Sequence, residues 1–203
     1  VPVVFVNIGG ISNLTYLGKA DEIISFDSGP GNFLIDKLLQ LKSNNKIQFD
    51  KNGEIALKGR VDRNILDSYL GDPYYDSQPP KSLDVNDFSL SPVRGLCVED
   101  SIATLSEFTV LTITNSLYFF PNKPRKIILC GGGRKNKYIF ERIKQISRIS
   151  TLNIDEYNIN GDFIESQAFA YLAIRSFFKK PITFNMTTGT SKPTTCGKLI
   201  EFK

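Results

Sequence analysis

The chain of 203 residues contains no histidine and no tryptophan, and it has one methionine and three cysteines. Without histidine, Ser-His-Asp and Cys-His catalysis, HExxH zinc sites and histidine proton shuttles are all excluded. Acid and base chemistry therefore falls to carboxylates. Cys97, Cys130 and Cys196 are far apart and form no CxxC pair, so they indicate neither a disulfide framework nor a zinc ribbon, and reduced thiols in a cytoplasm fit them best.

A long hydrophobic run is also missing. A membrane-spanning helix needs roughly 18 apolar residues in succession, whereas the nearest stretch, Phe108 to Phe120, is interrupted by threonine, asparagine and serine. We interpret it as a buried helix that ends before Pro121, and we expect no membrane partner. The 25 basic and 21 acidic residues are scattered, and no basic run is long enough to follow a nucleic-acid backbone, so we expect no nucleic-acid partner.

Hydrophobic residues make up 41% of the chain, which is enough for a domain with a core of its own. The first six residues are an apolar run, Val1 to Val6, with no initiator methionine and no basic segment of the kind that begins a signal peptide. A buried strand at the first residue suggests a chain cut out of a longer one.

Strand and helix patterns alternate along most of the sequence. Alternating or continuous apolar runs predict strands at 3–7, 11–17, 23–26, 126–130 and 152–157, the first two joined by the Gly9-Gly10 turn. Helical spacing predicts helices at 33–39, 55–69, 99–120, 138–149 and 165–178. Polar and proline-rich stretches predict loops at 44–53 and 71–92. Together these elements predict an α/β domain with a mixed β-sheet.

Three glycine-rich segments follow predicted strands. They are Asn7 to Leu14, Asp27 to Asn32 and Cys130 to Asn136. Glycine lets the backbone N–H groups of a turn approach a phosphate or a flat ring closely, because no Cβ stands in the way. None of the segments matches GxGxxG or GxxxxGK[ST], and an ordinary tight turn explains each of them as well.

Two carboxylates are candidate functional groups: Asp27 in the second glycine segment, and Glu165 at the start of the helix predicted at 165–178. Asp27 follows a predicted strand, where ligands bind in open α/β sheets, and is our candidate general base; it could instead accept hydrogen bonds from the loop backbone. Glu165 begins a helix whose Ala168, Phe169, Leu172 and Ala173 are expected to pack inward. A glutamate in a first turn is also explained as a partner of the helix dipole.

Six segments in this order resemble the anhydro-N-acetylmuramic acid kinases, members of the actin, hexokinase and Hsp70 fold group. They are NIGGISNLT at 7–15, FDSGPGNFLID at 26–36, DPYYDSQPPKS at 72–82, TLSEFTVLTI at 104–113, LCGGGRKN at 129–136 and ESQAFAYLAIR at 165–175. One such motif would be weak evidence, but six in order along nearly the whole chain are specific.

The resemblance implies one actin-like ATPase (ribonuclease H-like) domain over residues 1–203, with a mixed sheet flanked by helices. It also implies that this is the second, carboxy-terminal domain of a two-domain sugar kinase. The amino-terminal domain of the family, roughly 150 residues long, is absent from this chain and carries the first phosphate loop. The expected partners are a separate chain that supplies that domain and a second copy of the enzyme in a homodimer. The expected location is the cytoplasm.

The resemblance assigns roles to individual residues. It makes Asp27 the catalytic base and Glu165 a contact of the sugar substrate. Contacts with ATP are expected from the three glycine segments, at Asn7, Gly9, Gly10, Ser12, Asn13, Gly29, Gly31, Asn32, Gly131, Gly132, Gly133 and Asn136. ATP and Mg²⁺ are the implied cofactors, and no side chain is assigned as a metal ligand.

The family reaction opens a 1,6-anhydro ring with water and phosphorylates O6, and it belongs to cell-wall peptidoglycan recycling and amino-sugar catabolism. Asp27 would take a proton from the water that attacks the anomeric carbon, and the freed O6 would attack the γ-phosphate of ATP. Two differences from the family pattern stand out. Ser28 replaces the usual threonine, and Leu83 to Asn86 replace a Thr-Gly-Arg-Glu stretch, so we assign no site residue there.

Three other functions are compatible with parts of this pattern. A non-catalytic remnant of such a kinase would explain the missing half. A glycosidase using Asp27 and Glu165 would need their carboxyl groups about 5 to 9.5 Å apart. Another actin-fold sugar kinase would share the glycine loops.

Overall fold

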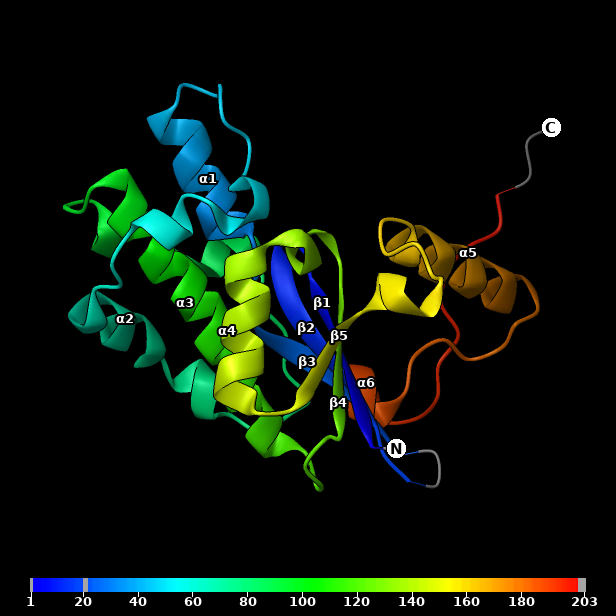
Figure 1. Ribbon diagram of the computed structural model, residues 1–203. Helices are drawn as coiled ribbons and strands as arrows, with labels where there is room; N and C mark the ends of the chain where they lie inside the picture. The colour runs from blue at the N-terminus through cyan, green and yellow to red at the C-terminus, as the bar shows by residue number, and fades with distance from the viewer. Residues whose placement is uncertain (1, 20–21, 201–203) are drawn as a thin grey trace.

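The computed structural model describes residues 2–19 and 22–200. Val1 and residues 201–203, the two ends of the expected 1–203 domain, lie outside the described residues. Most of the described chain forms a mixed sheet with helices on one side, and α5 stands on the other side (Figure 1).

The sheet has five strands in the order β3-β2-β1-β4-β5. They are β1 (Val3–Ile8), β2 (Ile11–Leu17), β3 (Ile23–Pro30), β4 (Lys126–Cys130) and β5 (Ser150–Asn153). β2 is antiparallel to both β1 and β3, whereas β4 is parallel to β1 and β5 is parallel to β4. Four strands, β1, β3, β4 and β5, therefore end at the same edge of the sheet, where ligands bind in α/β domains.

The first hairpin forms because its side chains alternate in character. Residues 4, 6 and 8 of β1 and 12, 14 and 16 of β2 are fully buried, while the residues between them are partly exposed. This alternation fixes the pairing register, because a shift of one residue would turn the apolar set away from the core.

Helices α1 to α4 cover one side of the sheet (Figure 1). The helices are α1 (Phe33–Lys42), α2 (Arg63–Leu70), α3 (Val98–Ser116), α4 (Lys137–Ser147), α5 (Ile164–Phe177) and α6 (Asn185–Thr188). α3 is the central helix and is buried along almost its whole length, because α1, α2, α4 and the sheet all pack against it.

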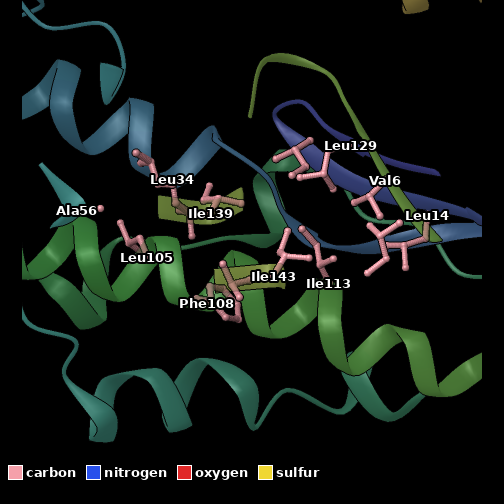
Figure 2. Close-up of a cluster of buried hydrophobic side chains, with 14 of the residues drawn as sticks. Val6, Leu14, Leu34, Ala56, Leu105, Phe108, Ile113, Leu129, Ile139 and Ile143 are labelled. Atoms are coloured by element: carbon pink, nitrogen blue, oxygen red, sulfur yellow. The ribbon is translucent and has the colours of Figure 1, made fainter. Parts of the chain in front are cut away.

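The main hydrophobic core lies between the sheet and these helices. Figure 2 shows side chains from both layers meeting there, among them Val6, Leu14, Leu34, Ala56, Leu105, Phe108, Ile113, Leu129, Ile139 and Ile143. All ten are at most 2% exposed. Burial of this apolar surface is the dominant favourable term in folding.

The predicted helix at 55–69 is wrong over its first half. A short 3-10 turn at Ala56–Lys58 precedes α2, and Gly59 between them is extended. A Cβ added at Gly59 would lie 2.0 Å from the Glu99 carbonyl oxygen, so the chain packs tightly on α3 at this extended glycine. α2 then begins at a cap in which Ile65 N donates to Asp62 Oδ1 at 3.0 Å.

Three other predicted elements also differ from the structure. The strand expected at 152–157 is β5 at Ser150–Asn153, followed by a 3-10 turn at Ile154–Tyr157. The helix expected at 99–120 ends at Ser116 and continues as a 3-10 turn to Phe119. The inward packing expected of α5 is wrong: none of its residues is buried, since only Ile164 packs on the sheet and the segment at 195–199 lies loosely beside Leu172 and Ser176.

Candidate active site

The first two glycine segments join at the edge where β1 and β3 end. Gly31 N donates to Gly10 O at 2.8 Å and Asn32 N donates to Gly9 O at 2.7 Å. The Asn32 side chain donates to Ile8 O at 3.1 Å as well. These bonds close the hairpin turn onto the start of α1.

The third glycine segment packs against the same place. A Cβ added at Gly131 would lie 2.5 Å from Asn7 Oδ1, and one at Gly133 would lie 2.3 Å from Ile8 Cγ2 and 3.2 Å from Asn32 Nδ2. Gly131 also has φ +72°, a backbone conformation that residues with a side chain rarely adopt. The structure therefore brings together all three segments that the sequence singled out, and we call this place the three-loop junction.

The residues predicted to contact ATP differ in their exposure at this junction. Gly10 and Gly132 are exposed, and a Cβ at Gly132 would meet nothing within 4 Å. Ser12 and Gly29, in contrast, face inward. The Ser12 hydroxyl lies 2.7 Å from Ser28 Oγ in a fully buried pair, and a Cβ at Gly29 would lie 2.5 Å from Thr112 Oγ1.

Ser12 and Gly29 therefore join β2 and β3 to each other and to α3 rather than offering their side-chain faces to a nucleotide. Gly31 is similar, because a Cβ there would lie 2.2 Å from Gly9 O. At these three positions the loops are closely packed, and the contact with ATP that the sequence predicts for them stays a prediction. Asn7, Gly9, Asn13, Asn32 and Gly131 are partly exposed, so their expected contact with ATP stays a prediction.

A cavity of about 450 Å³ opens beside the junction. Among its lining residues are Asn32, Gly132, Gly133 and Asn136, which the sequence predicted, and Ile35, Asp36, Phe49 and Lys135, which it did not assign. Asn136 also caps α4, because its Oδ1 accepts a hydrogen bond from Ile139 N at 3.2 Å. The cavity thus combines a glycine floor, the positive end of a helix and an apolar wall, features suited to a nucleotide.

Asp36 and Asp50 place negative charge on one wall of this cavity. Burial, together with the nearby Asp50 carboxylate, raises the pKa of Asp36 to about 6. Asp50 accepts hydrogen bonds from Ile55 N and Ala56 N at 2.9 and 3.0 Å, so it holds the adjoining loop in place. Asp36 lies in a quoted motif, whereas no local sequence signal marked Asp50.

Asp27 lies inside β3, three residues before the strand ends, rather than after it as predicted. Its Oδ2 accepts a hydrogen bond from Leu83 N at 2.9 Å, and its backbone pairs with Asn13 of the first glycine segment. Burial raises the pKa of Asp27, while the hydrogen bond from Leu83 lowers it to a smaller degree. A raised pKa brings a carboxylate closer to the range suited to a general base.

Glu165 occupies the first turn of α5 and is exposed. Within residues 2–19 and 22–200, no hydrogen bond or ion pair joins it to Asp27 or to the three-loop junction. The structure therefore does not bring the two predicted carboxylates together by any direct contact.

Arg134 is a residue that sequence reasoning missed. Its side chain is buried, and it pairs with Asp155 at 2.7 Å and with Asp162 at 2.9 Å while donating to Gly131 O at 2.9 Å. These bonds tie the third glycine segment to the turn that precedes α5. The guanidinium lowers the pKa of Asp155 to about 2. Its two acidic partners are 21 and 28 residues away in sequence, so no local sequence pattern indicated these ion pairs.

The described residues contain no group of three or more His, Cys, Asp or Glu side chains that could hold a metal ion. In the same part of the chain, no helix has both the length and the apolar character to cross a membrane.

The strand order, with three antiparallel strands and two parallel ones added beside β1, defines an actin-like ATPase (ribonuclease H-like) domain. The family description that matches is anhydro-N-acetylmuramic acid kinase, over residues 1–201. The chain belongs to this family.

Curated relatives agree with this assignment. The chain is 40% identical over 200 residues to an anhydro-N-acetylmuramic acid kinase of Zymomonas mobilis, covering 98% of this chain and 54% of the relative. It is 41% identical over 199 residues to one of Caulobacter vibrioides, covering 98% and 53%. The chain thus spans about half the length of the curated relatives it matches. These shares do not say which half, so the expected carboxy-terminal placement stays a prediction.

Solved structures show more distant similarity. A xylulose kinase from Lactobacillus acidophilus with bound ligand is 13% identical with a TM-score of 0.47, covering 74% of this chain and 34% of that one. An activator of 2-hydroxyisocaproyl-CoA dehydratase from Clostridium difficile, with bound ADPNP, is 10% identical with a TM-score of 0.47, covering 75% and 53%. Such scores are too low to add to the assignment, which rests on the strand order and the family.

Proposed function

We propose that this chain supplies the catalytic base and part of the ATP site of an anhydro-N-acetylmuramic acid kinase. The whole enzyme would convert 1,6-anhydro-N-acetylmuramic acid, water and ATP to N-acetylmuramic acid 6-phosphate and ADP. The observation that carries the proposal is the three-loop junction. It lies at the sheet edge where β3 ends, three residues beyond Asp27.

The junction offers room for phosphates. Gly132 borders open space and Gly10 lies in an exposed turn. A Cβ at either position would project toward a bound ligand, so glycine there lets a phosphate approach the backbone closely. The adjoining cavity has the size of a site for a small molecule. Phe49, which is 58% exposed, provides a flat apolar surface on which a base could stack.

Mg²⁺, when bound, neutralises charge on the phosphates. This ion is usually held by one or two carboxylates together with phosphate oxygens and water, so it needs no cluster of three acidic residues.

Asp27 is held in a defined orientation for proton transfer. Its Oδ2 is occupied by Leu83 N, while Oδ1 accepts no hydrogen bond from the described residues. Oδ1 would take the proton from a water molecule as that water adds to the anomeric carbon. The bond between the anomeric carbon and O6 breaks, and O6 then forms a bond to the γ-phosphorus of ATP as ADP leaves.

The remaining expectations belong to this proposal. Glu165 would contact the sugar, and the other half of the enzyme, on the same or a separate chain, would complete the cleft. We place the enzyme in peptidoglycan recycling in the cytoplasm and expect a homodimer. The observation that the chain spans about half of its relatives favours a second candidate, a non-catalytic remnant of the kinase.

The test is to incubate the purified chain with Mg-ATP and the anhydro sugar in ¹⁸O-labelled water. Labelled N-acetylmuramic acid 6-phosphate that disappears in Asp27→Asn is expected if the chain is active alone. If no product forms, adding the other half of a family member should restore it. ATP binding should be measured in parallel by calorimetry, and a chain that neither binds ATP nor gains activity on complementation is the remnant.

A further inference from the structure

A long loop crosses β3 directly at Asp27. Tyr74 Oη donates to Asp27 O at 2.7 Å, and Asp27 N donates to Lys81 O at 3.1 Å. Leu83 N then donates to Asp27 Oδ2 at 2.9 Å. Residues 72–83, which we call the crossing loop, therefore hold both the backbone and the carboxylate of Asp27.

The crossing loop has little regular structure of its own to hold it there. It contains one 3-10 turn, at Pro73–Asp76, and no strand. A segment of this kind keeps one position only if side chains anchor it, because exposed loops open easily.

Lys81 is the anchor. Its ammonium donates to Tyr74 O at 2.9 Å and to Tyr75 O at 3.3 Å, so it closes the loop on itself. The same nitrogen lies 4.6 Å from the centre of the Tyr74 ring, 4.5 Å from that of Phe119 and 5.7 Å from that of Phe26. Phe26 belongs to β3 and Phe119 to the turn after α3, so one charge joins the loop to two elements of the core.

This arrangement requires a cation. A half-buried ammonium loses hydration, and burial lowers the pKa of Lys81. Aromatic faces attract the nitrogen only while it carries its charge, and its hydrogen bonds to carbonyl oxygens are stronger when it is charged. No ion pair involves Lys81 in the part of the chain that the structure describes, so the rings and carbonyls are its direct partners. The Asp76 carboxylate acts from farther away and offsets part of the effect of burial on the Lys81 pKa.

We propose that Lys81 is a positioning residue for Asp27, acting through the crossing loop: its charge holds the loop on β3, and the loop brings Leu83 N to the Asp27 carboxylate. This inference rests on the proposed function, since it takes Asp27 as the base. It goes beyond the proposed function because the sequence led us to assign no site residue at 83–86, where the chain differs from the family pattern, and none in the rest of this loop.

The test measures the loop without any substrate. Amide hydrogen exchange of Leu83 and the carboxyl pKa of Asp27 would be followed by NMR in the unmodified chain and in Lys81→Met. We expect the Leu83 amide to exchange at least about 10-fold faster in Lys81→Met, since opening of the loop controls its protection. The Asp27 pKa should fall toward its ordinary value, because burial under the loop is the larger cause of its shift.

Lys126→Met is the matched control. Lys126 also lies near an aromatic ring, 6.0 Å from the centre of Tyr157, but it begins β4 at the opposite edge of the sheet. It should leave both signals unchanged. If Lys81→Met leaves the Leu83 exchange rate and the Asp27 pKa as they are in the control, the positioning role is refuted.

Lys81→Gln serves if Lys81→Met does not fold. It keeps an N–H donor and removes the charge on a side chain one atom shorter, so faster Leu83 exchange in this variant supports the role of the cation, and unchanged exchange refutes it. ATP binding and turnover are measured separately. If the Lys81 variants show no change by NMR while the unmodified chain is active, the positioning role alone is overturned. If the variants show the NMR change but the unmodified chain neither binds ATP nor turns over substrate, the result counts against the proposed function.

Discussion

Adding one methyl group at either of two neighbouring glycines should separate the stability of the three-loop junction from its use as a ligand site. A Cβ at Gly133 would lie 2.3 Å from Ile8 Cγ2 and 2.7 Å from Ile8 Cβ. Ile8 is fully buried at the end of β1, so it has no free space into which to move. A Cβ at Gly132 would meet nothing within 4 Å.

The expected magnitudes differ accordingly. Overpacking of a tight core costs about 1–3 kcal/mol, so Gly133→Ala should lose about that much free energy of unfolding. In a chain of this size, 1 kcal/mol corresponds to a Tm change of about 2–4 °C, so a drop of about 4–8 °C is expected for the middle of that range. Gly132→Ala should raise the free energy of unfolding by less than about 1 kcal/mol, because alanine reduces the conformational freedom of the unfolded chain.

Urea unfolding of both variants, with ATP titration by calorimetry, tests the pair. Gly132→Ala should weaken ATP binding by about 10-fold, on the order of 1.4 kcal/mol, while it remains folded. Equal stability of Gly133→Ala and the parent would refute the close packing of the loops. Unchanged ATP affinity in Gly132→Ala would refute the placement of the nucleotide over this glycine.

Three further predictions concern the framework of the site. Arg142→Met should cost about 3–5 kcal/mol in urea unfolding, because Glu107 is 1% exposed and would lose its ion pair. Asp62→Ala should cost about 1 kcal/mol by removing the cap of α2, again measured in urea. Asp36→Asn should be about 1 kcal/mol more stable than the parent above pH 7, a figure reduced for solvent exposure, and equal to it below pH 4.

The sign of the Asp36 effect follows from its raised pKa. The folded chain favours the neutral carboxyl, so the parent matches Asp36→Asn below pH 4 and becomes less stable than the variant as the pH rises through about 6. A parent that gains stability over this range relative to the variant would contradict it. For Arg142, the double variant with Glu107→Gln should recover much of the loss, and a cost below about 1 kcal/mol for Arg142→Met alone would contradict the buried pair.

The hairpin, the three glycine segments and the order of strands and helices could be predicted from local sequence. Alternation of apolar residues is fixed by the two faces of a strand, and glycine marks places where the backbone must turn or approach another chain segment. The family could be recognised for a similar reason, since its motifs are short and contiguous.

The ends of helices and strands could not be predicted as well from local sequence. The extended backbone at Gly59 is set by contact with Glu99, 40 residues away in sequence, which no periodicity at 55–69 reveals. The exposure of α5 was hidden for the opposite reason: its apolar spacing predicts a buried face, but only the tertiary structure shows that none of its residues is buried.

What the sequence by itself determined is therefore the class of domain, the family and the candidate base Asp27. The tertiary structure alone decided which candidates face outward and what holds them. Ser12 and Gly29 turned inward, Arg134 acquired two acidic partners, and Leu83 reached Asp27 across 56 positions of sequence. Contacts of this kind depend on how separate elements pack against one another, and packing is a property of the folded chain as a whole.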